Sequence, residues 1–261
     1  MKKLKFSLIF GYAFLYLPIL VLIAYSFNDS DRVMLFTHFS TRWYAALWQD
    51  AELIGAALLS FKIAAISASF SVLIGLCAGM VLHRYSQFRG RTLFVGLLAV
   101  PIILPEIILG LCLLLLFIAS HDLLGLPSIR GSLTISIAHI TLALGYVTII
   151  ILASLNRNLQ ELDEAAADLG ASAFTIFWRI TLPLLRPALA SGWLLSFMLS
   201  LDDLIVASFV SGPGAKTLPM LIFSKIRFGV NPEINAVSSL LILVTILILS
   251  IYLLFVRKKA K

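Results

Sequence analysis

Long runs of apolar residues alternate with short polar stretches along this chain. Each run has about 20 residues or more and few charges, which is the length that a helix needs to cross the hydrocarbon core of a bilayer. A helix bonds its own backbone groups, so in lipid these runs predict helices rather than strands. We place six transmembrane spans near residues 6–27, 59–82, 93–119, 133–153, 189–210 and 236–256.

The composition supports a membrane protein. Apolar residues make up 61% of the sequence and charged residues 13%, and the mean hydropathy is +1.03. A soluble domain of this length does not need so many apolar side chains. Cys77 and Cys112 both lie in apolar runs, which argues against a disulfide framework or a zinc site. We therefore expect an all-α membrane protein with a single transmembrane domain over residues 1–261.

The first apolar run has two interpretations. Lys2, Lys3 and Lys5 precede it, as basic residues precede the apolar core of a signal peptide. The run over residues 6–27 is nevertheless long enough to span a bilayer. We expect an uncleaved first transmembrane helix.

The basic residues indicate how the spans are oriented. Six spans put both ends of the chain on one side, together with the stretches 83–92 and 154–188. That side holds thirteen of the 20 Lys and Arg residues, and the other side holds seven over a longer stretch of chain. The positive-inside rule then places both termini and residues 154–188 in the cytoplasm. Because this asymmetry explains the net charge of +7, the charge does not indicate a nucleic-acid partner.

The longest stretch on the basic side, residues 154–188, is amphipathic. Glu161–Leu169 consists of good helix formers. Gly170 can take a positive φ, which would end that helix and turn the chain. Ala171–Ile180 can form a second short helix, and Pro183 lies just before the next predicted span. The sequence thus predicts a helix, a glycine turn and a second helix outside the membrane.

The residue spacing in this stretch resembles a known motif. Glu164-Ala165-Ala166 is followed after three residues by Gly170, and after nine more by Ile180-Thr181-Leu182-Pro183. This pattern resembles the EAA motif of ATP-binding-cassette (ABC) importer permeases. The resemblance implies a coupling helix that docks in a groove of an ATPase subunit, and its coupling residues would be Glu164, Ala165, Ala166, Gly170 and Pro183. The alternative is an ordinary loop helix, in which Glu164 only favours the helix N-terminus.

Three carboxylates fall inside or at the edge of apolar runs: Glu106, Asp202 and Asp203. A charge at the centre of a membrane helix costs about 2.5–3.5 kcal/mol on insertion scales, so each acid needs a cavity, a partner or a function. Pro101 and Pro105 should break or kink the third span beside Glu106. Adjacent residues point about 100° apart on a helix, so Asp202 and Asp203 cannot face one cavity equally. Pairing with Lys62 or with a partner subunit is the alternative role.

A negative, partly dry cavity favours cations over anions such as sulfate, molybdate or phosphate. Trp43 and Tyr44, expected at the outer membrane surface, would add an aromatic face for a cation. The same pair also suits an interfacial aromatic belt.

Further stretches resemble a narrower family. They are residues 25–28, 40–44, 104–107, 164–170, 200–204, 207–214, 217–220 and 229–236. They look like the polyamine permeases of ABC importers, which carry putrescine or spermidine, and Ser-Gly-Pro-Gly at 211–214 is closest to the putrescine members. The resemblance implies the six-span fold of type I ABC importer permeases and a substrate pathway that contains Trp43, Glu106, Ser200, Asp202 and Asp203. The family carries Asp at position 106, so Glu106 differs in its reach.

The same resemblance implies an assembly in the lipid of a bacterial inner membrane. Such a permease pairs with a homologous second permease, two ATP-binding subunits and a periplasmic polyamine-binding protein. ATP and Mg are then bound by the ATPase subunits, so the chain itself would hold no cofactor, no metal and no catalytic residue. We expect a permease subunit that imports polyamine, with putrescine as the first candidate, and that is not itself an enzyme.

Two alternatives stay open. The cargo could be spermidine, or the chain could be an ion-coupled secondary transporter of organic cations in which Glu106 and Asp202 carry protons. A secondary transporter has no ATPase to dock on an EAA element. The sequence indicates no catalytic Ser-His-Asp set. His139 in the fourth span is expected to be a buried packing residue, and the alternative is a residue of the substrate pathway.

Overall fold

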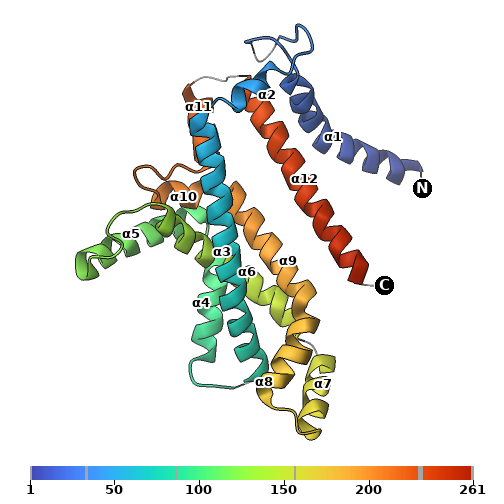
Figure 1. Cartoon of the computed structure of the whole chain (residues 1–261), viewed down its shortest axis with the longest axis vertical. Coiled ribbons are helices and arrows are strands. Elements are labelled where there is room, and N and C mark those ends of the chain that lie inside the picture. Colours follow the sequence, from blue (N-terminus) through green and yellow to red (C-terminus); the bar gives the residue numbers. More distant parts are fainter. Residues whose placement is uncertain (1, 33–34, 86, 156, 229–231, 260–261) are drawn as a thin grey trace. The chain divides into compact units, whose positions relative to one another are not determined.

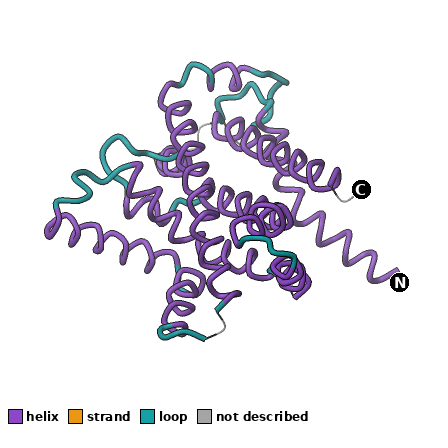
Figure 2. The backbone as a smooth tube through the Cα atoms, turned by 60° about the horizontal axis from the view of Figure 1, so that its bottom comes forward, coloured by secondary structure: helices purple, strands orange, loops and turns teal. Residues whose placement is uncertain are grey.

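The computed structural model describes residues 2–32, 35–85, 87–155, 157–228 and 232–259, and the regular elements in these ranges are all helices (Figure 1). The helices are α1 (Lys2–Ser26), α2 (Arg42–Leu47), α3 (Ala51–Arg84), α4 (Arg91–Ile103), α5 (Glu106–Leu124), α6 (Ser132–Ser154), α7 (Arg157–Asp168), α8 (Ala173–Ile176), the π-helix η1 (Phe177–Thr181), α9 (Leu182–Asp202), α10 (Ile205–Val210), α11 (Leu218–Phe228) and α12 (Glu233–Lys259). Helices account for most of the trace in Figure 2. The prediction of an all-α fold is confirmed.

Among the described residues, six helical segments are long and apolar enough to cross a membrane. They are Ser7–Ser26, Ala51–Arg84, Glu106–Leu124, Ser132–Ser154, Ala173–Asp202 and Glu233–Tyr252. The predicted number of spans is therefore confirmed. The third and fifth spans differ from the prediction in where they begin and end.

The predicted third span, residues 93–119, is two helices. α4 ends at Ile103, Leu104 is extended with ψ 138°, and α5 begins at Glu106. Pro105 causes this break, because the residue before a proline is disfavoured in the α conformation. Pro101 instead lies inside α4. The predicted break beside Glu106 is confirmed, and it lies at the second proline.

The predicted fifth span, residues 189–210, differs from the observed helical segment at both ends. The helical segment already begins at Ala173 and passes through the π-turn of η1 into α9. Pro183 lies in the first turn of α9, where a missing backbone N–H is tolerated. The segment stops at Asp202, because Asp203 is extended with ψ 120°. The expected short helix over Ala171–Ile180 is present as α8 and η1, and it continues directly into α9.

The chain divides into two compact units. Unit 1 comprises residues 1–55 and 221–261, and unit 2 comprises residues 56–220. Within unit 1, α12 packs against α1 and α2. The single transmembrane domain over residues 1–261 stays a prediction.

Helix α6 is the centre of unit 2 and contacts α4, α5, α9 and α10. Gly75 and Gly79 of α3 face it: a Cβ built on Gly75 would lie 2.9 Å from Val147 Cγ1, and one on Gly79 would lie 3.2 Å from Ile151. Small residues permit this close helix packing. Because α6 is so enclosed, any polar side chain on its buried face needs a partner within the protein.

Candidate functional site

The predicted glycine turn after α7 is present. Gly170 has a φ of +84°, its N–H donates to Ala167 O at 2.9 Å, and the N–H of Ala171 donates to Ala166 O at 3.0 Å. This pair of bonds is a Schellman motif, which ends a helix with a left-handed residue. Ala166 and Gly170 therefore shape the turn through their backbones.

A side-chain contact holds α7 against η1. Thr181 Oγ1 donates to both oxygens of the Asp163 carboxylate, at 3.1 and 3.4 Å, and Thr181 is buried. Glu164 is exposed and accepts a hydrogen bond from Gln160 Nε2 at 2.9 Å. Ser172 caps α8 by accepting from the N–H of Thr175 at 3.3 Å. The two helices of the loop are thus fixed relative to each other within unit 2, while Glu164 stays accessible.

A cavity of about 290 Å³ lies between this loop and the end of α3. Its lining includes the basic side chain of Arg84 from α3, together with Asp163 and Glu164 from α7 and Phe177 from η1. Both signs of charge and an aromatic ring therefore face one hollow beside the EAA residues. Such a hollow suits a protein partner with mixed polar and apolar groups.

Large apolar side chains are exposed along the same loop. Leu169, the residue before the turn, is 90% exposed, and Leu162, Phe174 and Trp178 are exposed as well. We call these four residues the loop patch. Contiguous exposed apolar residues mark protein interaction sites. Sequence reasoning missed the loop patch, although large apolar residues beside a polar helix and its glycine turn are a readable signal.

Glu106 and Asp202 lie at the two helix breaks of unit 2. Glu106 is in the first turn of α5 and Asp202 is the last residue of α9. Both acids are exposed in this chain, and within the described ranges no ion pair joins either one to Lys62. An exposed carboxylate is not stable against lipid, so these acids face a polar cavity or another subunit.

Asp203 has a different environment from its neighbour. It is 7% exposed, and its carboxylate accepts from the N–H of Val206 at 3.2 Å and of Ala207 at 2.7 Å. These bonds cap the N-terminus of α10. The same carboxylate lies 3.0 Å from His139 Nε2, and His139 Nδ1 lies 2.6 Å from Ser200 Oγ. Ser200 and Asp203, both predicted in the pathway, are therefore bonded inside the protein.

His139 is 1% exposed and both of its ring nitrogens have partners, which confirms the expected buried histidine. The sequence did not indicate that Ser200, His139 and Asp203 meet, because 61 and 64 residues separate the bonded pairs. The three residue types are those of a hydrolase triad, but here the serine is buried and the acid accepts hydrogen bonds from the first-turn N–H groups of α10. They form a structural network.

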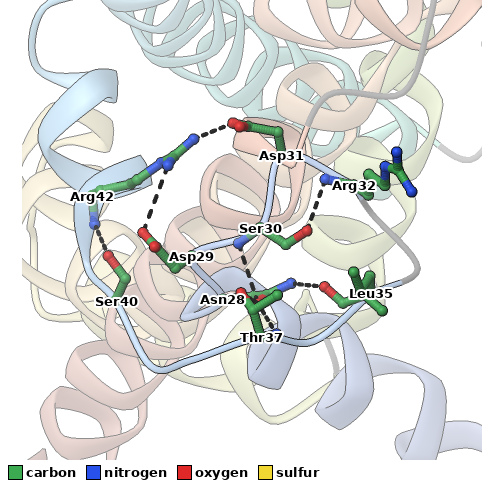
Figure 3. A network of polar contacts seen from close by, with 9 residues as sticks. All are labelled: Asn28, Asp29, Ser30, Asp31, Arg32, Leu35, Thr37, Ser40 and Arg42. Carbon is green, nitrogen blue, oxygen red and sulfur yellow. Dashed lines mark hydrogen bonds and ion pairs between the residues drawn. The ribbon is translucent and has the colours of Figure 1, made fainter.

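Trp43 lies in unit 1, on α2. A network of polar contacts joins residues of the loop before α2 (Figure 3). The Asn28 side chain donates to Leu35 O at 2.7 Å and accepts from the N–H of Thr37 at 3.0 Å. Arg42 pairs with Asp31, and with Asp29 at 3.6 Å.

The Arg42 guanidinium lies 4.4 Å from the centre of the Trp43 ring. Tyr44 Oη is 2.7 Å from Ser26 Oγ. One face of Trp43 therefore already holds a cation, which is the interaction that the sequence suggested for a cargo. The aromatic-belt alternative for Trp43 and Tyr44 stays open, and nearby Trp48 is 76% exposed.

Unit 1 also contains an ion cluster. Lys225 Nζ donates to Asp50 at 2.6 Å and to Glu233 at 3.3 Å, and Asp50 caps α3 by accepting from the N–H of Leu53 at 3.0 Å. The hydrogen bond from Lys225 holds the pKa of Asp50 below its usual value. Burial acts to lower the pKa of Lys225, but the bond to Asp50 and the charge of Glu233 outweigh it and raise that pKa. This cluster ties α11 to the starts of α3 and α12.

Comparison with known proteins decides the family. The family described as "Binding-protein-dependent transport system inner membrane component" matches residues 71–258, which is most of the chain. The chain belongs to this family. This permease is thus a multi-pass membrane protein, and its residues 164–183 carry the EAA motif of the family.

Two relatives resemble this permease over nearly all of its length. The putrescine transport system permease protein PotI of Escherichia coli (strain K12) is 48% identical over 235 residues, which cover 90% of this chain and 84% of the relative. The spermidine/putrescine transport system permease protein PotC of the same strain is 40% identical over 250 residues, or 96% of this chain and 92% of the relative.

Solved structures have the same fold. A chain of a bacterial ABC transporter involved in the import of the acidic polysaccharide alginate superposes with a TM-score of 0.67 at 17% identity, covering 98% of this permease and 95% of that chain. A chain of an amino acid ABC transporter gives 0.60 at 18% identity, covering 83% and 98%. The fold is that of ABC importer permeases, as predicted.

Proposed function

We propose that this permease imports a polyamine, with putrescine as the preferred cargo, as one subunit of an ABC importer. The names of the similar PotI and PotC proteins support this cargo class. The observation that carries the choice is the pair Glu106 and Asp202, two exposed carboxylates at two helix breaks. A polyamine carries separated ammonium charges, and each loses hydration on entering a cavity unless a carboxylate or carbonyl replaces it.

The exposure of the two acids also supports a second membrane subunit. Carboxylates that lie between apolar helices and face outward from one chain need a polar surface opposite them. A homologous permease supplies such a surface, and the cation path then runs between the two chains. A polyamine-binding protein would deliver cargo to the face that carries Trp43.

The loop patch and the cavity beside it support an ATPase partner. Leu162, Leu169, Phe174 and Trp178 offer apolar area, and Asp163, Glu164 and Arg84 offer charges around it. Two ATP-binding subunits would dock here, bind ATP and Mg, and transmit their movement through α7 and η1. Docking requires the loop to lie in the cytoplasm, and with six spans both termini then lie there too. This orientation agrees with the distribution of basic residues.

The test is uptake by the assembled complex. The permease is purified with its bound subunits, reconstituted in ATP-loaded proteoliposomes, and supplied with binding protein and labelled putrescine. We expect ATP-dependent uptake that vanadate blocks, that unlabelled spermidine reduces weakly, and that sulfate does not affect. Uptake that resists vanadate and stops with a protonophore would instead support the ion-coupled secondary transporter.

A further inference from the structure

The buried network of Ser200, His139 and Asp203 lies directly behind the exposed Asp202. Asp202 ends α9 and Asp203 begins the extended turn before α10, so the two carboxylates diverge. One points out of the chain, and the other is buried against α6. The direction in which Asp202 points therefore depends on what holds Asp203 inward.

Asp203 accepts three contacts within its buried site, from the Val206 N–H, the Ala207 N–H and His139. The two amide bonds come from the turn that directly follows Asp203, so they move together with it. His139 is on α6, the central helix of unit 2, and it is the partner that ties this turn to another part of the fold.

The donor and acceptor roles of the two His139 ring nitrogens follow from their partners. The Asp203 carboxylate accepts hydrogen bonds from both amides and acts as an acceptor toward His139 as well. His139 Nε2 therefore bears the hydrogen and donates a hydrogen bond to the carboxylate. In the neutral ring Nδ1 is then an acceptor and receives the hydroxyl proton of Ser200, at 2.6 Å. Ser200 thus selects the ring tautomer that donates to Asp203. All three side chains are buried, so water cannot replace a missing contact freely.

We propose that His139 is a positioning residue for the cation pathway. It anchors Asp203 as the cap of α10, and this anchor keeps the helix break in the shape that leaves Asp202 facing outward. Asp202 is then the acid of the pair that meets the cargo, and Asp203 is structural. The link to cargo rests on the proposed function, whereas the anchoring of α10 does not depend on it.

Two substitutions separate the contacts of His139. The amide nitrogen of a glutamine reaches the place of Nε2, and that of an asparagine reaches the place of Nδ1. His139→Gln therefore keeps a donor for Asp203, while His139→Asn keeps only the contact with Ser200. Thr141→Val is the matched control, because Thr141 lies one half-turn further along α6 and bonds only to Ile137 O in its own helix.

The first readout is hydrogen–deuterium exchange at the amides of Val206 and Ala207, measured on the full-length permease in lipid nanodiscs. We expect His139→Asn to speed their exchange by about ten- to a hundredfold, the factor of one hydrogen bond to a charged group. His139→Gln and Thr141→Val should exchange like the wild type. Equal exchange in the Asn and Gln variants, whether fast or slow, would overturn the anchoring role.

The second readout is putrescine uptake by the assembled complex, with ATPase activity in the same vesicles. We expect His139→Asn to lose about tenfold or more in uptake while ATP hydrolysis continues, and His139→Gln to retain most of the uptake. If the exchange data follow the expectation but the wild type moves no putrescine, the anchor stands and the proposed cargo fails. Normal uptake by His139→Asn would overturn the link between the anchor and the pathway.

Discussion

The EAA loop and the α9–α10 break show two different ways in which this permease builds a functional region. The loop is assembled from residues near one another in the sequence: a helix, a glycine turn with φ +84° and a second helix. The break instead depends on His139 of α6, which bonds residues 61 and 64 positions away. Substitutions within the loop itself should therefore disrupt the loop. The α9–α10 break, in contrast, can be disrupted by substituting a distant residue that does not contact the cargo.

The largest expected effect tests the loop. Gly170→Leu forces a branched residue into a left-handed conformation, which costs about 1–2 kcal/mol, and adds bulk at the docking turn. We expect uptake to be abolished with normal amounts of protein in the membrane. Gly125→Leu is the matched control, because Gly125 also ends a helix with a positive φ, +68°, and also has open space at Cβ. Normal uptake and normal ATPase co-purification in Gly170→Leu would contradict the assignment of the turn.

The second-largest expected effect tests the acids at the two helix breaks, Glu106 and Asp202. Asp202→Asn and Glu106→Gln keep the shape of the side chains and remove their charges, so we expect polyamine uptake to fall about tenfold or more, as for the loss of a charged hydrogen-bond partner. Protein level and bound ATPase should be unchanged. Asp122→Asn, an exposed acid near the end of α5, is the control. Normal uptake by both variants would make the two acids structural, although the family assignment would stand.

The sequence reveals the loop better than the break for a physical reason. Glu164 to Gly170 bond mainly with their near neighbours, so spacing alone predicts the helix and its turn. The break beside Glu106 was also readable, because Pro105 acts on the residue before it. The end of α9 at Asp202 carries no such signal. It depends on a carboxylate that caps the next helix and on a histidine from another span.

A smaller effect concerns Trp43 in unit 1. We expect Trp43→Ala to lower uptake more than Trp48→Ala, because Trp43 holds the Arg42 cation over its ring and Trp48 is exposed without such a contact in the described part of the chain. The Arg42 side chain is 43% exposed, and an exposed cation–π contact contributes about 0.5–1 kcal/mol. The measurement is the initial rate of putrescine uptake in both variants. Equal rates would favour the alternative in which Trp43 is part of an interfacial aromatic belt.

The smallest effect concerns stability and pH. The pKa of Asp50 is lowered from 3.8, so its contribution is present above that value and is lost as the pH falls through the folded-state pKa. The pKa of Lys225 is raised from 10.5, so its contribution is present below that value and is lost as the pH rises through the folded-state pKa. The ion cluster therefore stabilises the protein between about pH 5 and pH 10.

Lys225→Met should lower the stability at pH 7 by about 1 kcal/mol, since the pair is partly exposed. The measurement is thermal unfolding of the purified wild type and the Lys225→Met variant, at pH 7 and at a pH near the folded-state pKa of Asp50. We expect the difference between the variant and the wild type to shrink as Asp50 becomes protonated. A difference that is independent of pH would show that the charges of the cluster do not stabilise the fold.

We propose that the ATPase acts on this permease through the loop patch and that cargo is selected at the α9–α10 break. The most direct measurement records bound ATPase, ATP hydrolysis and putrescine uptake together for Leu169→Asp and Asp202→Asn in reconstituted complexes. Leu169 is 90% exposed, so its substitution leaves the fold intact. We predict that Leu169→Asp loses all three signals, whereas Asp202→Asn keeps bound ATPase and hydrolysis and loses uptake. The claim is contradicted if Leu169→Asp behaves like the wild type, or if Asp202→Asn loses its ATPase along with its uptake.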